Sequence, residues 1–146
     1  DLGAVEQVAD RVAVMENGRV IEKGDVFNVF SDPQNPASQR FVGTVIKGIP
    51  SPAERASLRE RHRGRLVTFS FRDGDSSQAQ VFVDLAQAGL DFELVYGGIN
   101  DIRGRAFGHL TLAIRGTDAA IDAALASIRS HASVTEIDAT DEEGAR

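Results

Sequence analysis

The chain has 146 residues, enough for one ordinary domain or for a small domain with an attached segment. Its formal net charge of -6 provides no overall cationic field for phosphates, so we expect no nucleic acid as a partner. The absence of cysteine excludes disulfides and thiolate metal sites, and no apolar run reaches the roughly 20 residues that span a bilayer. Residues 1–6 show neither an initiator Met nor a secretory signal, so we expect the chain to begin inside a longer polypeptide.

A β-hairpin is the first expected element, over residues 10–24. Two short alternating runs flank Asn17 and Gly18. This dipeptide favours a type I′ hairpin turn, because both of its central residues need a positive φ.

Two short helices are expected after the hairpin. Asp25 is suited to cap the first helix, and Pro33 ends it. The second helix is expected to follow Pro36. The aromatic residues of this segment would be left exposed if the chain lacks elements that normally cover them, and these are Phe27, Phe30 and Phe41.

A boundary is expected at residues 48–52, where two prolines and a glycine resist regular structure. The following stretch, 53–65, carries five arginines interspersed with glutamates. Because the opposite charges weaken any local field, we expect a solvated and partly helical linker rather than a phosphate-binding surface.

A β-α-β-β-α-β unit is expected from Gly64 onward. The two helices are amphipathic, and a capping box is expected where the first one starts, at Ser77. Two such helices need one sheet face to cover them, which favours a ferredoxin-like α+β sandwich whose opposite sheet face stays available. The expected strands are 66–71, 92–103, 106–115 and 133–137, with helices between the first and second and between the third and fourth.

The second of these strands contains Gly97 and Gly98, which predict a bend in the strand. Their missing side chains permit a bulge, or a close approach by another backbone or by a ligand. On the third strand, alternation places Phe107 and His109 on the sheet face away from the helices. These positions make this edge of the sheet the candidate site, with an ordinary bulged strand as the alternative.

The first part of the chain resembles the end of an ABC ATPase domain. The resemblance rests on the hairpin of residues 10–24 and on the short helix and proline break that follow, over 29–33. In that family this region follows the switch histidine, so the resemblance implies that the Walker, signature and switch-histidine motifs belong to a preceding parent domain. We therefore expect no catalytic residue, metal site or cofactor on this chain, with ATP and Mg bound by the parent ATPase domain.

The second part resembles the NIL domain, a relative of the ACT regulatory domains found in methionine-importer ATPase subunits. The family's Asn-Ile-Leu, its glycine, its isoleucine pair and its Phe-Gly correspond to Glu93-Leu94-Val95, Gly97, Ile99, Ile102, Gly104 and Phe107-Gly108. The two resemblances define the expected organisation: an ATPase remnant at 1–47, a linker at 48–63, a NIL/ACT-like domain at 64–138 and a disordered acidic tail at 139–146.

This combination implies a regulatory module of a methionine ABC importer. Two such domains would pair as a homodimer and bind methionine near their interface, so that cytoplasmic methionine inhibits its own uptake. The parent would contact a membrane permease and lie on the cytoplasmic, inner face of the membrane. The implied ligand-binding residues are Glu93, Leu94, Val95, Tyr96, Gly97, Gly98, Phe107 and His109.

Glu93 stands where the family usually has asparagine. A carboxylate attracts the ammonium group of an amino acid and repels its carboxylate, so another amphipathic amino acid is an alternative ligand. Two other classes of function stay open: a purely structural dimerisation domain without ligand, and a small ferredoxin-like enzyme related to the acylphosphatases. The second would need a phosphate-binding loop with a positioned polar side chain, and the sequence has neither.

Overall fold

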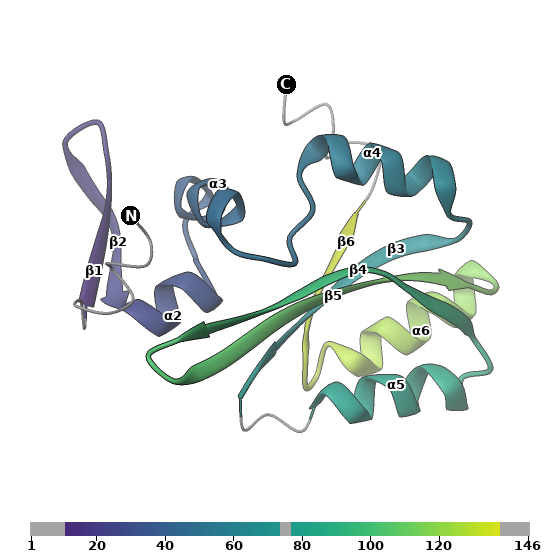
Figure 1. Ribbon diagram of the computed structural model, residues 1–146. Helices are drawn as coiled ribbons and strands as arrows, with labels where there is room; N and C mark the ends of the chain where they lie inside the picture. Colours follow the sequence, from purple (N-terminus) through teal and green to yellow (C-terminus); the bar gives the residue numbers. More distant parts are fainter. Residues whose placement is uncertain (1–10, 74–76, 138–146) are drawn as a thin grey trace.

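The computed structural model describes residues 11–73 and 77–137 (Figure 1). The predictions for the chain start, the Ser77 side chain and the acidic tail lie outside this part. The elements in chain order are β1 (Arg11–Glu16), β2 (Arg19–Asp25), α2 (Val26–Ser31), α3 (Pro36–Val45), α4 (Pro52–Arg61), β3 (Arg65–Arg72), α5 (Ser77–Gln87), β4 (Asp91–Ile102), β5 (Arg105–Arg115), α6 (Asp118–Ile128) and β6 (Ser133–Ile137).

The predicted ferredoxin-like α+β fold is confirmed. Four antiparallel strands form one sheet in the order β4-β5-β3-β6, with α5 and α6 on one face and α4 on the other (Figure 1). We call the first face the helix face. The opposite one is the strap face, named after residues 46–62, the strap that lies on it.

The helix face holds the main core, because alternate strand residues point into it. Val67, Phe69 and Phe71 of β3 are buried there, while Thr68 and Ser70 point to the strap face. The same alternation on β5 buries Leu112 and Ile114 against the helices. The apolar stripes of the two helices complete this core with Val81, Leu85, Ile121, Leu125 and Ile128.

The N-terminal hairpin forms as predicted. β1 and β2 pair antiparallel, and the turn has positive φ at Asn17 (53°) and Gly18 (78°). Asp25 then caps α2, because its carboxylate accepts a hydrogen bond from the Asn28 amide at 2.8 Å. Asn35 caps α3 in the same way.

A second core joins the N-terminal segment to the sheet. Phe27 meets Phe107 of β5 edge to face, with ring centroids 5.6 Å apart, and the Arg105 guanidinium lies 3.8 Å from the Phe27 centroid. The expectation that Phe27 and Phe30 are exposed is therefore wrong, since the β4–β5 hairpin covers them. The expectation of exposure is confirmed for Phe41, which is 51% exposed. The members of this core are Val26, Phe27, Phe30, Val42, Ile46, Ile102 and Phe107.

The prediction that the second sheet face stays available is also wrong. Leu58 of α4 is 1% exposed and shares a third core with Leu66 and Ala113 on the strap face. Val95 and Tyr96 of β4 pack against the same cluster. The linker helix has enough apolar surface, centred on Leu58, to cover the sheet rather than remain solvated. Within the described part of the chain, no helix combines the length and apolar composition needed to cross a membrane.

Candidate functional site

The predicted ligand residues come together on two neighbouring strands. Residues 93–98 lie on β4, and Phe107 and His109 lie on β5, where His109 is the register partner of Gly98. Because side chains alternate along a strand, these residues are divided between the two faces of the sheet. Two of the predicted residues, Leu94 and Gly97, are on the helix face. The others are on the strap face: Glu93, Val95, Tyr96, Gly98, Phe107 and His109.

The β-bulge lies earlier on β4 than the glycine pair. The register shifts between Leu94 and Tyr96, while Gly97 and Gly98 pair regularly with β5. A bulge places an extra residue on one strand, and here it turns both Val95 and Tyr96 toward the α4 side. The prediction of a bulge at the glycines is therefore wrong by a few residues, because a β-branched and an aromatic side chain find a common apolar partner there.

The alternative prediction for Gly98, close approach of another backbone, is confirmed. A Cβ on Gly98 would lie 2.7 Å from the Gly48 nitrogen and 2.8 Å from the carbonyl carbon of Lys47. Gly48 has a positive φ of 98°, and a Cβ there would lie 2.7 Å from the Gly98 nitrogen. Each glycine thus makes room for the other chain segment.

Asn100 fixes this contact through both ends of its side-chain amide. The amide oxygen accepts a hydrogen bond from the Lys47 backbone N–H at 2.9 Å, and the amide nitrogen donates to the Lys47 carbonyl at 2.8 Å. Sequence reasoning missed this residue. The available signal was its position two residues after Gly98, which places both on the same face of the strand.

Tyr96 is bound to the first turn of α4. Its hydroxyl donates to Glu54 Oε2 at 2.6 Å. Glu54 also completes a capping box with Ser51, whose backbone N–H donates to Oε1 at 2.9 Å. The hydrogen bond from Tyr96 lowers the pKa of Glu54, and the same bond raises the pKa of Tyr96.

Glu93 is held at the other end of α4. Its Oε1 lies 3.0 Å from His62 Nδ1 and 3.8 Å from the Arg115 guanidinium. The carboxylate is about half exposed, with 47% of the side-chain surface accessible, so an ammonium group can reach it. His62 is the neighbour with which such a group would compete.

Phe107 lies underneath the N-terminal part of the chain, and the His109 ring lies beside it, with ring centroids 6.0 Å apart. Phe107 is covered by Phe27, and His109 is buried with its Nδ1 2.9 Å from Ser70 Oγ. Burial lowers the pKa of His109, which favours the neutral imidazole. Both residues support the fold of this face, and neither is accessible to a ligand while the N-terminal segment is docked.

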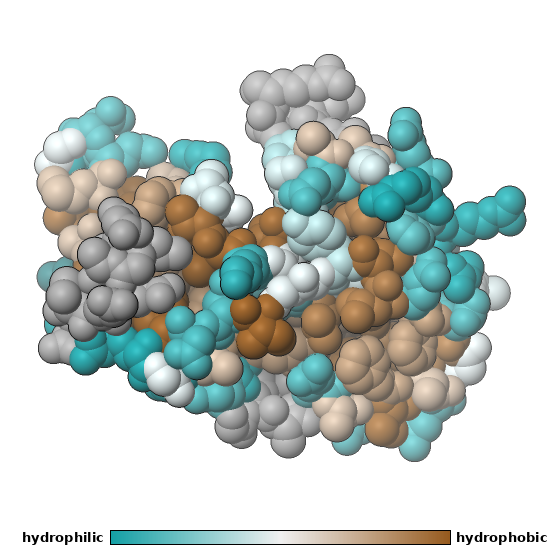
Figure 2. All heavy atoms as spheres, in the orientation of Figure 1, coloured by the Kyte–Doolittle hydropathy of each residue, from teal (hydrophilic) through white to brown (hydrophobic). Residues whose placement is uncertain are grey.

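The exposed apolar residues of β4 lie on the helix face of the sheet. Leu94 is 61% exposed and Ile99 is 62% exposed, and they flank Gly97 at the edge of the sheet. Figure 2 shows hydrophobic residues gathered over the region that β4 crosses in Figure 1. Because β4 is an edge strand that pairs only with β5 among the described strands, its outer backbone groups are available to another strand.

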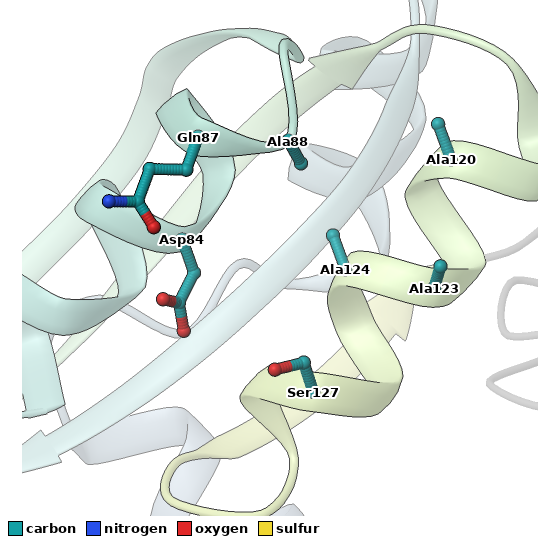
Figure 3. Close-up of a pocket in the computed structure, with 7 residues that line it drawn as sticks. All are labelled: Asp84, Gln87, Ala88, Ala120, Ala123, Ala124 and Ser127. Carbon is teal, nitrogen blue, oxygen red and sulfur yellow. The ribbon is translucent and has the colours of Figure 1, made fainter.

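A pocket of about 440 Å³ lies elsewhere, in the groove between α5 and α6 (Figure 3). Its lining contains none of the predicted ligand residues. The Asp84 carboxylate at its rim is already engaged, by His131 Nε2 at 3.0 Å and by Gln80 Nε2 at 2.7 Å. The groove is lined by Asp84, Gln87, Ala88, Ala120, Ala123, Ala124 and Ser127, and these offer no cluster of polar groups pointing to one centre.

The sheet order, the two helices on one face and the βαββαβ order define a ferredoxin-like domain joined to an N-terminal segment. Residues 65–137 match the NIL domain family, and the chain belongs to that family. This range agrees with the extent of the ferredoxin-like unit.

Similarity to known proteins extends beyond that domain. The chain is 45% identical over 139 residues to the methionine import ATP-binding protein MetN 2 of Rhodococcus jostii, covering 95% of this chain and 41% of the relative. It is 44% identical over 138 residues to the methionine import ATP-binding protein MetN of Leifsonia xyli, covering 94% and 40%. The chain thus spans about two fifths of the length of these relatives.

A solved C-terminal domain of an ABC transporter ATP-binding protein from Enterococcus faecalis is 17% identical. The matched region covers 57% of the present chain and 94% of the solved domain, with a TM-score of 0.44. The family assignment rests on the NIL match instead.

Proposed function

We propose that this chain is the regulatory C-terminal portion of the ATP-binding subunit of a methionine ABC importer. In this proposal it binds an amino acid, methionine in the first place, and lowers uptake when the cytoplasmic concentration is high. The observation that carries the proposal is similarity to methionine import ATP-binding proteins over 94–95% of the chain, through the N-terminal segment as well as the NIL domain.

The partners follow from the same similarity. The parent subunit would lie on the inner face of the membrane and contact a permease, and its preceding ATPase domain would bind ATP and Mg. A second copy would pair through the regulatory domain. The available edge of β4, with Leu94 and Ile99 exposed beside it, is suited to a homodimer because pairing would satisfy backbone groups and cover apolar surface.

The charges near Glu93 suit the ammonium and carboxylate groups of an amino acid. The Glu93 carboxylate can accept the ammonium group, and Arg115, 3.8 Å from Glu93, can attract the carboxylate of the ligand.

A purely structural dimerisation domain without ligand is the second candidate. It is favoured by the strap, which covers most of the predicted ligand residues on the strap face. This candidate predicts association that depends on concentration and no response to any amino acid.

Thermal unfolding with increasing L-methionine separates the two candidates. A ligand at 100 times its Kd adds about 2.7 kcal/mol to the free energy of unfolding, so the melting temperature should rise with L-methionine and not with glycine. Light scattering at several protein concentrations would report the dimer. Identical melting with and without millimolar L-methionine would contradict ligand sensing.

Glu93 can be tested directly with a matched control. Glu93→Ala should weaken the binding of L-methionine or change the preference among amino acids, as measured by calorimetric titration. Asp91→Ala removes a neighbouring carboxylate that pairs with Arg115 at 2.8 Å, and it should not weaken binding, because it leaves Glu93 in place and frees Arg115 for the ligand carboxylate. Equal titrations for both variants would remove Glu93 from the site.

A further inference from the structure

The strap, residues 46–62, follows β4 from Ile102 back to Glu93. Ile46 shares a core with Ile102, Lys47 is clamped by Asn100, and Gly48 lies on Gly98. Further along, Glu54 binds Tyr96, Leu58 packs near Val95, and His62 binds Glu93. The strap therefore runs antiparallel to β4 and contacts each residue of that strand that points to the strap face between Glu93 and Ile102.

The contacts are of two physical kinds. At the N-terminal end and in the middle, backbone, amide and apolar contacts bury Gly48 and Leu58. At Glu54 and His62 the contacts are polar and lie at the surface, as a hydroxyl-to-carboxylate bond of 2.6 Å and an imidazole-to-carboxylate pair of 3.0 Å. These polar contacts use the Tyr96 and Glu93 side chains, the same groups that the proposed ligand site offers.

We propose that the strap is an internal competitor for the amino-acid site, and that ligand binding releases the polar contacts of α4 from β4. This inference rests on the proposed function, because it concerns the same residues. An ammonium group bound at Glu93 takes the place of His62, and a ligand beside Tyr96 takes the place of Glu54. The strap follows directly on α3 and the N-terminal segment. Release of its polar contacts therefore links ligand binding at the site to that segment.

The competition has a measurable consequence for affinity. When only a fraction of molecules has an open site, the apparent Kd equals the intrinsic Kd divided by that fraction. Weakening the strap therefore tightens ligand binding. An exposed ion pair contributes little, so His62→Ala should lower the apparent Kd for L-methionine by about two- to fivefold. Glu54→Ala combined with His62→Ala should lower it by about tenfold.

Two matched controls distinguish release of the strap from general loosening. His131→Ala removes another histidine–carboxylate pair, with Asp84 at 3.0 Å, away from the strap face. Ser51→Ala removes the hydroxyl from the capping box of α4 but leaves the Tyr96–Glu54 bond in place. His131→Ala should bind L-methionine with the Kd of the unmodified chain, and Ser51→Ala, which keeps the Tyr96–Glu54 bond, should lower the Kd by less than the double variant does.

Hydrogen exchange of the 146-residue chain supplies the second readout. L-Methionine should slow exchange in β4 and accelerate it at both ends of α4, near residues 51–54 and 59–62. Ordinary stabilisation by a ligand would slow exchange in both places. Far-UV circular dichroism of each variant confirms that it is folded.

The outcomes separate this inference from the proposed function. Lower apparent Kd values in the strap variants, with faster exchange at the ends of α4, support the strap as competitor. Binding of L-methionine with unchanged Kd values, or with slower exchange throughout α4, overturns the strap proposal alone. No binding of L-methionine to the unmodified chain or to any variant overturns both.

Discussion

Phe27→Ala tests whether the N-terminal segment and the NIL domain unfold as one unit. The Phe27 side chain is 3% exposed and lies between Phe107 and Arg105 of the β4–β5 hairpin. Removing a buried phenyl ring costs about 2–3 kcal/mol of transfer free energy, and the aromatic pair adds about 0.5–1.5 kcal/mol. We therefore expect a loss of about 3–4 kcal/mol, within the range of measured Phe→Ala substitutions in cores.

Urea unfolding can be followed with two probes. Tyr96 is the single tyrosine and the chain has no tryptophan, so intrinsic fluorescence reports the strap face of β4. Circular dichroism reports all helices and strands. In Phe27→Ala the fluorescence and circular dichroism transitions should shift together, and both should report the full loss of about 3–4 kcal/mol in the free energy of unfolding. Phe41→Ala, which removes a half-exposed ring at 51% accessibility, should change the free energy of unfolding by less than about 1 kcal/mol.

The two variants together can refute the reasoning. If Phe27→Ala and Phe41→Ala have equal small effects, the segment does not dock on the hairpin. If circular dichroism shifts while the Tyr96 transition stays in place, the segment docks but folds separately from the domain. Either result would contradict a shared core between the two parts of the chain.

Other substitutions test individual contacts. Gly98→Ala should cost about 1–3 kcal/mol in urea unfolding because its Cβ would lie 2.7–2.8 Å from backbone atoms of Gly48 and Lys47, whereas Gly97→Ala should cost less, because its Cβ meets the end of the Leu110 side chain at 2.9 Å and the His109 carbonyl oxygen at 3.1 Å. Burial lowers the pKa of His109 below its ordinary 6.5, so the unfolded chain takes up a proton first as the pH falls from 7.5 to 5.5. His109→Gln should therefore lose less stability than the unmodified chain over this window, by up to about 1.4 kcal/mol per pH unit. Glu22→Ala should cost about 1 kcal/mol in thermal unfolding, since its carboxylate accepts the Asn35 N–H at 2.8 Å.

The parts of the fold that local chemistry determines could be predicted from the sequence. A positive φ at Asn17 and Gly18, a cap at Asp25 and a cap at Thr117 each depend on a few neighbouring residues. The alternation of β3 likewise identifies its buried face without knowledge of the rest of the chain. These features place the sheet and its two helices, and hence the strands of the candidate site.

The covering of the strap face could not be predicted in this way. Leu58 is one apolar residue in a strongly charged helix, and local composition favours a solvated linker. Its burial depends on Leu66 and Ala113, which become neighbours only when the sheet has formed. The bulge at Val95 has the same origin, because a partner from another element decides which way that side chain turns.

The energies of the contacts decide which part of the strap the proposed ligand would release. Burial of Leu58 stabilises the docked strap by about 1.5–3 kcal/mol, and the core around Phe27 adds more. An exposed pair such as His62–Glu93 contributes only about 0.2–1 kcal/mol. The coupling free energy between two sites in a protein is typically 1–3 kcal/mol. This is larger than the contribution of an exposed polar contact, and smaller than the combined contribution of Leu58 burial and the core around Phe27. In the proposed competition, a small ligand would displace Glu54 and His62 while Leu58 and the hairpin core stay docked, so the signal would be a change in the angle of α4 rather than its detachment.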